Sequence, residues 1–419
     1  MALVVTKFGG TSVGSPDRIR AVALRLISRK RAGDDVVAVV SAMGHVTDEL
    51  VDLARQITPE PPDREMDMLL STGEQVSISL LAMAIIAEGF DAVSFTGAQV
   101  GIVTDSVHSK AKITEVRADR VREAIADGKI VIVAGFQGMT EDGTITTLGR
   151  GGSDTTAVAV AAGIGADVCE IYTDVDGVYT ADPRIVPDAR KIDVLSYEEM
   201  LEMAASGAGV LQMRSVEFAR NHGVTIHCRS SFNDSPGTIV KEADETMEQA
   251  IISGVTHDAS EAKVTIKDVP DMPGVAAQVF SAMAESNVNV DMIIQNVSED
   301  GTTDISFTVP KDDLVRARRA VAVIVAKLGA RDFSVDESIA KVSLVGAGMK
   351  THPGVAAKMF STLADSGVNI DLISTSPIRI SCVISASQVT DAVLALHGAF
   401  GLSNEEITSE ISPAAGGEL

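Results

Sequence analysis

The sequence predicts an α/β protein in which a mostly parallel, doubly wound sheet is followed by two small α+β units. Three observations support this prediction. In the first half, short apolar runs alternate with amphipathic segments, which is the pattern of buried parallel strands joined by helices. Only 3% of the residues are aromatic, so the cores must depend on aliphatic side chains. In the second half, one segment occurs twice.

The charge composition of the sequence argues against some classes of binding partner. The 419 residues include 35 basic against 58 acidic side chains, a net charge of -23, without a dense basic tract. We therefore expect neither nucleic acid nor membrane as a partner, because both favour positively charged surfaces. We see no signal peptide and no apolar run of membrane-spanning length, and the scattered Cys169, Cys228 and Cys382 predict free buried thiols in a cytoplasmic protein.

The first predicted strand, Leu3–Phe8, leads through a glycine loop into a helix. Ser15 is expected to cap this helix, with Pro16 at its first position and its end near Arg31. A polar, charged stretch at 233–247 predicts the end of a first domain at 1–240. Further strands are expected at 36–40, Ala92–Phe95, Ile130–Ala134, 167–172 and 224–228, and further helices at 65–88, 115–126, 153–164 and 210–221.

The repeat comprises residues 272–293 (MPGVAAQVFSAMAESNVNVDMI) and 352–373 (HPGVAAKMFSTLADSGVNIDLI). Thirteen of the 22 positions are identical without a gap. Each copy follows Ala-Lys-Val and an apolar strand, so each predicts a strand, a Pro-Gly turn, a helix and a second strand. We therefore expect two small α+β units at 248–337 and 338–411, followed by a flexible tail at 412–419.

Residues 7–12, Lys-Phe-Gly-Gly-Thr-Ser, connect the first strand to the first helix. Gly9 and Gly10 would let backbone N–H groups approach an anion, and Lys7 would add positive charge. This is not a Walker A loop, because no Gly-Lys-Ser/Thr follows the glycines. A tight turn with a surface lysine is the alternative, and spacing alone leaves both interpretations open.

Residues 148–156, Leu-Gly-Arg-Gly-Gly-Ser-Asp-Thr-Thr, place an arginine between glycines where a helix begins. Arg150 is suited to bidentate binding of a carboxylate. Ser153 is either part of such a site or an ordinary helix N-cap. Capping alone does not explain an arginine in this setting.

Residues 172–184 form an acidic loop at the end of a predicted strand, where open α/β sheets bind ligands. A calcium loop is disfavoured because the EF-hand positions and the closing glutamate are absent. Two weaker signals are Ser41 with nearby Thr47, and Glu74 in a helical stretch. Their polar groups suit an amino-acid substrate, although capping is the commoner use.

The motifs KFGGTS, VSAMG, STGE, LGRGGSDTTA and YTDVDGVYTADPR occur in the order and approximate spacing of aspartate kinases. Over nearly its whole length the chain resembles a monofunctional member of that family, with an amino acid kinase fold and two ferredoxin-like ACT domains. The resemblance implies ATP-dependent phosphorylation of the L-aspartate side chain to 4-phospho-L-aspartate, with feedback by lysine, threonine or both. It implies ATP and Mg²⁺ without protein metal ligands, and a homo-oligomer or an assembly with a regulatory chain that starts near Met247.

The resemblance also implies roles for individual residues. Lys7, Gly9 and Gly10 would neutralise the phosphates, while Asp154 would orient Lys7 and the substrate. The nucleotide pocket would be completed by Thr173, Asp174, Tyr179, Asp182 and Arg184. L-aspartate would contact Ser41, Thr47, Glu74, Arg150, Gly151 and Ser153, with Glu74 at its ammonium. Effectors would contact Asp271, Gly274, Val275, Ala276, Asn289, Asp291, Gln295, Asn296, Asn369 and Asp371; turn capping is the alternative for Asp271 and Asp291.

One position departs from the family pattern, because Gly209 stands where family members usually have a lysine that contacts ATP phosphate. This predicts weaker activity or a substitute cation such as Arg214. A catalytically silent amino-acid sensor and another carboxylate kinase are the alternatives. A dinucleotide dehydrogenase, suggested by the glycines at 346 and 348, is disfavoured because Thr351 occupies the place of the third glycine.

Overall fold

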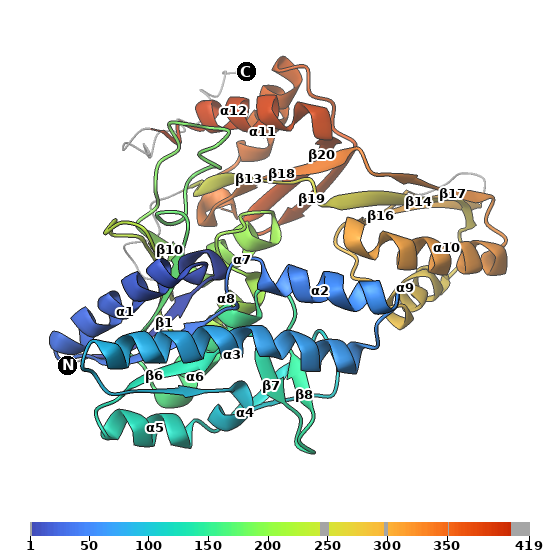
Figure 1. Ribbon diagram of the computed structural model, residues 1–419. Helices are drawn as coiled ribbons and strands as arrows, with labels where there is room; N and C mark the ends of the chain where they lie inside the picture. Colours follow the sequence, from blue (N-terminus) through green and yellow to red (C-terminus); the bar gives the residue numbers. More distant parts are fainter. Residues whose placement is uncertain (1, 244–250, 297–300, 351, 404–419) are drawn as a thin grey trace. The chain divides into compact units, whose positions relative to one another are not determined.

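The computed structural model describes residues 2–243, 251–296, 301–350 and 352–403, so Met247 and the tail at 412–419 lie outside the described residues. The chain forms two compact units, which are described separately (Figure 1). The first comprises Met1–Val178, Lys191–Ala204 and Gly209–Met247, and the second comprises Tyr179–Arg190, Ala205–Ala208 and Glu248–Leu419.

An eight-stranded sheet forms the centre of the first unit. Its order is β10-β12-β11-β9-β1-β2-β6-β3, and all neighbours pair in parallel except β12 and β11. The strands are β1 Leu3–Phe8, β2 Asp35–Val40, β3 Ala92–Phe95, β6 Ile130–Ala134, β9 Val168–Thr173, β10 Val194–Ser196, β11 Ile226–Ser230 and β12 Thr238–Lys241. The predicted mostly parallel sheet is thus confirmed, with boundaries shifted by one or two residues at β2, β9 and β11.

Helices cover both faces of this sheet. On one face, α1 (Pro16–Arg31) and α3 (Asp63–Ala87) pack against Phe8, Val40 and Ile132 (Figure 1). Helices α6 (Gly152–Ile164) and α8 (Met213–His222) pack together, and α6 also contacts β1, β2 and β9. The remaining helices are η1 Gly10–Val13, α2 Val46–Ile57, α4 Gly97–Val100, α5 Asp119–Ala126 and α7 Tyr197–Ala205. Ser15 caps α1 as predicted, because its side chain accepts from the Arg18 N–H.

A smaller four-stranded sheet, β5-β4-β7-β8, completes the first unit. Its strands are β4 Ile102–Thr104, β5 Ile113–Val116, β7 Gln137–Met139 and β8 Ile145–Thr147. The predicted helix at 115–126 was therefore wrong at its start. The segment at 113–116, in which three of four residues are β-branched, pairs with β4, and Ala118, with a φ of 52°, separates it from α5.

By length and composition, the 25-residue helix α3 could cross a membrane, so the prediction that no apolar run reaches that length was wrong here. However, 44% of its most apolar window is buried inside the protein. Its Ile78, Leu81 and Ile85 pack in the core beside β2 and β6. These contacts are those of a core helix in a folded domain.

Each repeat copy contributes one antiparallel sheet to the second unit, with two helices on it. The first sheet contains β14 Glu261–Pro270, β15 Ile293–Gln295, β16 Thr302–Pro310 and β17 Asp332–Asp336, with α9 Val275–Glu285, η2 Lys311–Asp313 and α10 Leu314–Leu328. The second contains β13 Gly254–Asp258, β18 Ile339–Val345, β19 Leu372–Ser376 and β20 Arg379–Ser385, with η3 Ala347–Lys350, α11 Val355–Asp365, η4 Ala386–Gln388 and α12 Val389–Ala399.

The predicted domain boundaries need two corrections. Strand β13, expected in the unit at 248–337, pairs with β18 of the other sheet. Segment Tyr179–Arg190, expected within the domain at 1–240, packs its Ala181 and Val186 into the core of that same sheet. Strand pairing and core packing of this kind depend on partners far away in the sequence, so local patterns do not reveal them.

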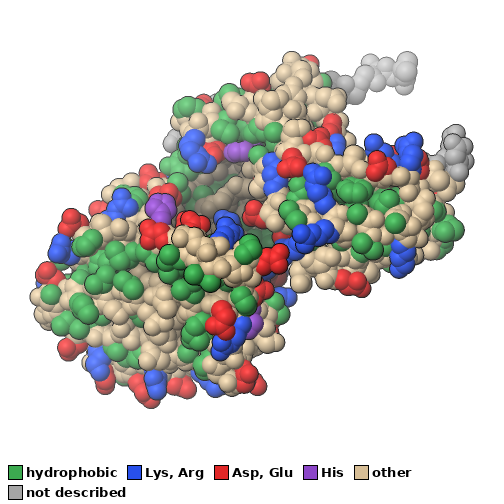
Figure 2. Space-filling view, turned by 45° about the vertical axis from the view of Figure 1, so that its right-hand side comes forward, with side chains coloured by type: hydrophobic (Ala, Val, Ile, Leu, Met, Phe, Trp, Pro, Cys, Tyr) green, Lys and Arg blue, Asp and Glu red, His purple; other side chains and the backbone are tan. Residues whose placement is uncertain are grey.

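The charged side chains are mixed on the face shown in Figure 2, where Lys and Arg lie among Asp and Glu. Over the whole sequence the acidic side chains outnumber the basic ones, 58 against 35. Mixed charge does not present the broad positive field that a nucleic-acid backbone would favour.

Candidate active site

A cavity of about 340 Å³ lies in the first unit, where β1 and β9 end. Because parallel neighbours end at one edge of a sheet, the loops after these strands meet there. The lining includes predicted residues from all five motifs, together with Thr47 and Gly209 from outside them: Lys7, Gly9, Gly10, Ser41, Thr47, Glu74, Arg150, Gly151, Ser153, Asp154, Thr173 and Gly209. The structure therefore brings together the predicted substrate residues and part of the predicted nucleotide set.

Lys7, on β1, forms an ion pair with Asp154, on α6, at 2.6 Å. The two side chains are only 13% and 10% exposed, which excludes the alternative of a surface lysine beside a plain turn. Gly10 is required for close packing, because a Cβ there would lie 2.9 Å from the Ala42 carbonyl oxygen. The loop thus holds a cation and exposes glycine backbone at the same cavity wall.

Glu74 is an almost fully buried carboxylate on α3, with 2% exposure. Its Oε1 accepts from the Ala42 N–H at 3.2 Å, while Oε2 has no hydrogen-bond partner among the described residues. Burial raises the pKa of Glu74 to about 7. A buried carboxylate oxygen without a partner beside a cavity is suited to receive a cationic group.

Arg150 lies between two glycines in the left-handed region, Gly149 at a φ of 77° and Gly151 at 69°. A Cβ at Gly151 would lie 2.1 Å from Cγ of Gln212, so only glycine fits there. Gly151 is the N-cap of α6, and Ser153 lies inside the helix. The alternative of Ser153 as the helix N-cap was therefore wrong, and its side chain lies at the cavity instead.

Gly209 also lines the cavity, and a Cβ added there would meet nothing within 4 Å. Arg214 does not replace the missing lysine. Its guanidinium donates to the carbonyl oxygens of Leu148, at 2.8 Å, and Ala111, at 2.6 Å, rather than lining the cavity. The hypothesis of Arg214 as a substitute cation is therefore wrong.

The rest of the predicted nucleotide set is divided between the units. Thr173 lines the cavity and donates to exposed Asp174. Tyr179, Asp182 and Arg184 belong to Tyr179–Arg190, in the second unit. There the Arg184 guanidinium pairs with Asp182 at 2.7 Å and lowers the pKa of that carboxyl. Their contact with a nucleotide stays a prediction.

In the second unit, the repeat produces two equivalent ion pairs that cross between its copies. Lys341 of the second copy contacts Asp291 of the first at 2.5 Å, and Lys263 of the first contacts Asp371 of the second at 2.6 Å. Lys341 is 1% exposed and also contacts Glu261 at 3.0 Å, whereas Lys263 is 19% exposed. Asp291 and Asp371 thus connect the two copies, so Asp291 is more than the turn cap that was its alternative interpretation.

The other predicted effector residues lie around these pairs. Gly274, with a φ of 93°, precedes α9, whose first residues are Val275 and Ala276. The Asp271 N–H donates to the Gly301 carbonyl, which fixes the approach to that helix. The predicted polar residues on the neighbouring segments are exposed, namely Asn289, Gln295, Asn296 and Asn369. They remain candidates for effector contacts.

Replacing Lys341 by methionine is expected to lower the free energy of unfolding by about 3 kcal/mol, because buried Glu261 would lose its counter-ion. Lys263→Met, at the equivalent but more exposed pair, should cost less than about 1 kcal/mol. Urea unfolding of the full chain measures both. Equal losses of unfolding free energy in the two variants would contradict the expectation that the buried pair of Lys341 contributes more to stability than the more exposed pair of Lys263.

Comparison with known proteins agrees with this architecture. Residues 2–230 match the amino acid kinase family, and residues 267–323 and 342–400 match the ACT domain. An aspartokinase from Mycolicibacterium smegmatis is 58% identical over 411 residues, covering 97% of this chain and 98% of the relative. The chain belongs to the aspartate kinase family.

Solved structures of aspartate kinases extend the comparison. E. coli aspartokinase III in complex with aspartate and ADP has a TM-score of 0.82 at 26% identity, covering 95% of this chain and 100% of that one. The same enzyme with lysine and aspartate has a TM-score of 0.73 at 26% identity, covering 94% and 99%. The predicted fold, an amino acid kinase domain followed by ACT domains, is confirmed, and this enzyme is an aspartate kinase rather than a dehydrogenase.

Asp67, a buried residue on α3, the helix that also carries Glu74, was missed by sequence reasoning. A signal was present, since Asp67, Ser71, Glu74, Ile78 and Leu81 follow helical spacing and are all buried on α3. A charged residue in line with the core residues of a helix indicates a buried polar network.

Proposed function

We propose that this aspartate kinase transfers the γ-phosphoryl group of Mg·ATP to the side-chain carboxylate of L-aspartate. The product would be 4-phospho-L-aspartate, the first intermediate of lysine, threonine and methionine biosynthesis in the cytoplasm. The observation that carries the proposal is one cavity lined by the Lys7–Asp154 ion pair, Arg150 and Glu74, whose Oε2 has no hydrogen-bond partner among the described residues. The aspartate and ADP bound by E. coli aspartokinase III support it.

In this proposal, the charged residues of the cavity bind the oppositely charged groups of L-aspartate. Glu74 would receive the ammonium of L-aspartate, and Arg150 would bind a substrate carboxylate through its planar guanidinium. Ser41, Thr47, Gly151 and Ser153 line the same wall and would contact the remaining polar groups. This arrangement leaves the reacting carboxylate free to face the nucleotide.

No general base is needed, because the attacking carboxylate is already ionised at neutral pH. Its oxygen bonds to the γ-phosphorus, the bond from phosphorus to the β–γ bridging oxygen breaks, and ADP leaves. Lys7 and the backbone of Gly9 and Gly10 would stabilise the charge on the transferred group, while Asp154 holds Lys7 in place. Mg²⁺, which accompanies ATP, would screen the phosphate charges, and Thr173 and Asp174 would contact the nucleotide.

We also propose feedback inhibition by lysine, threonine or both through the ACT sheets. The complex of E. coli aspartokinase III with lysine and aspartate supports this part of the proposal. The resemblance to the family also implies a homo-oligomer, or an assembly with a separate regulatory chain starting near Met247. Expression of the gene would test the second form, because a single full-length product excludes an internal start.

The test is formation of acyl phosphate from L-aspartate and Mg·ATP, trapped by hydroxylamine as the hydroxamate. It is run alone and with lysine, threonine or both. We expect activity that falls with at least one effector. Absence of hydroxamate, with stabilisation by lysine or threonine, would instead establish a silent sensor, and activity on another carboxylate alone would overturn the substrate assignment.

The pKa of Glu74 predicts a pH dependence. Since the ammonium of L-aspartate needs the ionised carboxylate, KM for L-aspartate should fall as pH rises through about 7. Glu74→Gln should abolish this slope and raise KM by about 10-fold or more, while KM for Mg·ATP stays unchanged. The same slope in the variant would exclude Glu74 as its source.

A second consequence concerns stability without substrate. Because the folded pKa lies above the usual 4.5, the folded state holds a proton that the unfolded state releases between about pH 4.5 and 7. The contribution of Glu74 to stability therefore declines across that interval as pH rises. Glu74→Gln should lack this decline.

Lysine restored at position 209 should raise kcat by about 10-fold, since one cation at transferring phosphate commonly contributes at least that much. The site accommodates it, because a Cβ there meets nothing within 4 Å. Gly209→Met is the matched control, with similar length and no charge. Equal kcat in the lysine and methionine variants would show that position 209 does not act on phosphate.

A further inference from the structure

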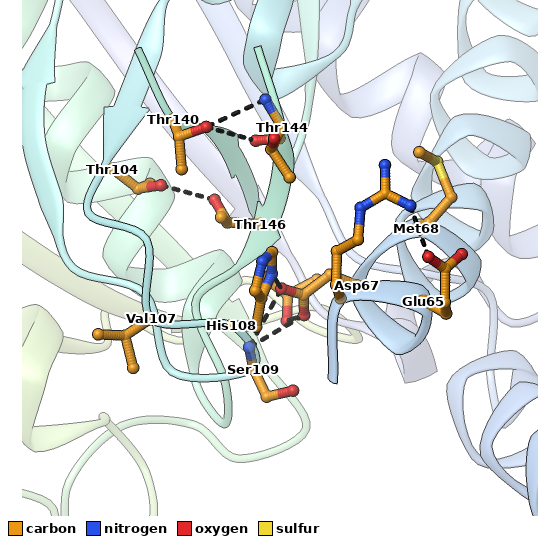
Figure 3. Close-up of polar contacts among 12 residues, drawn as sticks. Glu65, Asp67, Met68, Thr104, Val107, His108, Ser109, Thr140, Thr144 and Thr146 are labelled. Carbon is orange, nitrogen blue, oxygen red and sulfur yellow. Dashed lines mark hydrogen bonds and ion pairs between the residues drawn. The ribbon is translucent and has the colours of Figure 1, made fainter. Parts of the chain in front are cut away.

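Asp67 is a fully buried carboxylate on α3 that does not line the cavity. Figure 3 shows it facing His108 and Ser109. Oδ1 accepts from the Thr147 hydroxyl at 2.5 Å, both oxygens accept from the Ser109 N–H at 3.1 Å, and Oδ2 lies 2.6 Å from His108 Nδ1. One buried carboxylate therefore holds two separate segments, 108–109 and the end of β8.

Arg214, on α8, holds the continuation of the same two segments. Its guanidinium donates to the carbonyl oxygens of Ala111 and Leu148. The segments also bind each other directly, since the Ala111 N–H donates to the Thr147 carbonyl at 2.9 Å. Two helices thus fix the backbone at 108–111 and 147–148 with groups of opposite charge, the buried Asp67 carboxylate and the half-buried Arg214 guanidinium.

The fixed backbone leads directly into Gly149 and Arg150. Gly149 lies so close to the other segment that a Cβ would be 2.9 Å from the Ser109 carbonyl oxygen. Glycines on both sides give Arg150 little conformational restriction of its own. The anchored residues before Arg150, and α6 after it, hold the backbone on both sides of this residue.

We propose that Asp67 and Arg214 are positioning residues for L-aspartate, which act by holding the loop that carries Arg150 at the cavity wall. The inference rests on the proposed role of Arg150 as the ligand of a substrate carboxylate. Small displacements of a binding group are costly to catalysis, so both anchors should affect the use of L-aspartate more than that of Mg·ATP.

The experiment compares KM for L-aspartate and for Mg·ATP in Asp67→Asn and Arg214→Lys. Each should raise KM for L-aspartate by about 10-fold and change KM for Mg·ATP by less than about twofold. Asp142→Asn is the matched control for Asp67→Asn, because exposed Asp142 accepts from Thr140 at the turn between β7 and β8 and does not line the cavity. The control should leave both constants unchanged.

A milder pair of variants at Thr147 tests the positioning role if Asp67 or Arg214 is needed for folding. Thr147→Val removes the hydroxyl that donates to Asp67 and should raise KM for L-aspartate about threefold, while Thr147→Ser retains the hydroxyl and should restore it. Equal rises in both KM values, or no rise in Thr147→Val, would overturn the proposal.

An Arg150→Ala background separates this proposal from the proposed function. If Thr147 and Asp67 act through Arg150, Thr147→Val should have no further effect on KM for L-aspartate in that background. A threefold rise that persists there would overturn the positioning role even in an active enzyme. Unchanged KM in Arg150→Ala alone would instead overturn the role of Arg150, and absence of wild-type activity would overturn the proposed function itself.

Discussion

Lys7→Met is expected to lower kcat for aspartate phosphorylation by about 10²–10³-fold, because a fixed cation that meets charge in the transition state is worth that much. The basis is the position of Lys7 at the end of β1, paired with Asp154 at 2.6 Å on the cavity wall. Methionine keeps most of the side-chain length and removes the charge. Single-turnover formation of ADP measures the step directly.

The matched control is Lys30→Met, which removes a lysine of similar exposure from an ion pair with Asp35 on α1 and β2. This pair does not line the cavity, so the control should keep kcat within about twofold of the original. A loss in Lys7→Met no larger than in Lys30→Met would remove Lys7 from the reaction. Asp154→Asn should lower kcat in the same direction, since Lys7 would lose its orientation.

Arg150→Ala is expected to raise KM for L-aspartate by about 100-fold, because it would delete the two charge-assisted hydrogen bonds that we propose Arg150 makes to a substrate carboxylate. Arg150→Lys should recover only part of this loss, since lysine restores the charge without the planar fork. KM for Mg·ATP should change much less in both variants. Initial-rate kinetics with each substrate varied in turn measure the difference.

Arg117→Ala provides the control, because exposed Arg117 pairs with Glu115 on the smaller sheet and does not line the cavity. It should leave KM for L-aspartate unchanged. If Arg150→Lys behaved like the original residue, Arg150 would act only as a point charge. If Arg150→Ala changed nothing, the substrate carboxylate would have to be bound elsewhere.

Much of the fold was predictable because its signals are local. The apolar runs at Leu3–Phe8 and Ile130–Ala134 are strands with the predicted bounds, and Ser15 caps α1. The repeat predicted two similar α+β units, and two similar sheets are present. The resemblance to aspartate kinases grouped Lys7, Arg150 and Asp154 before any contact was known, and all three line one cavity.

Other features depend on contacts that no local pattern encodes. Strand β13 pairs with β18 across about 80 residues of sequence, and β5 is a strand because β4 lies beside it. Asp67 and Arg214 have polar partners on segments far from them in the chain. Such side chains are identified only when their partners are in place.

The sequence by itself determined the class of fold, the order of the motifs and the residue types at the cavity, because periodicity and motif chemistry are local properties. Only the tertiary structure decided that Lys341 is buried while Lys263 is not, that Arg214 supports a loop rather than serving as a substitute cation, and that Glu74 keeps one carboxylate oxygen without a partner among the described residues. Burial and hydrogen-bond satisfaction are properties of the three-dimensional surroundings, and those surroundings set the charge and reach of each group.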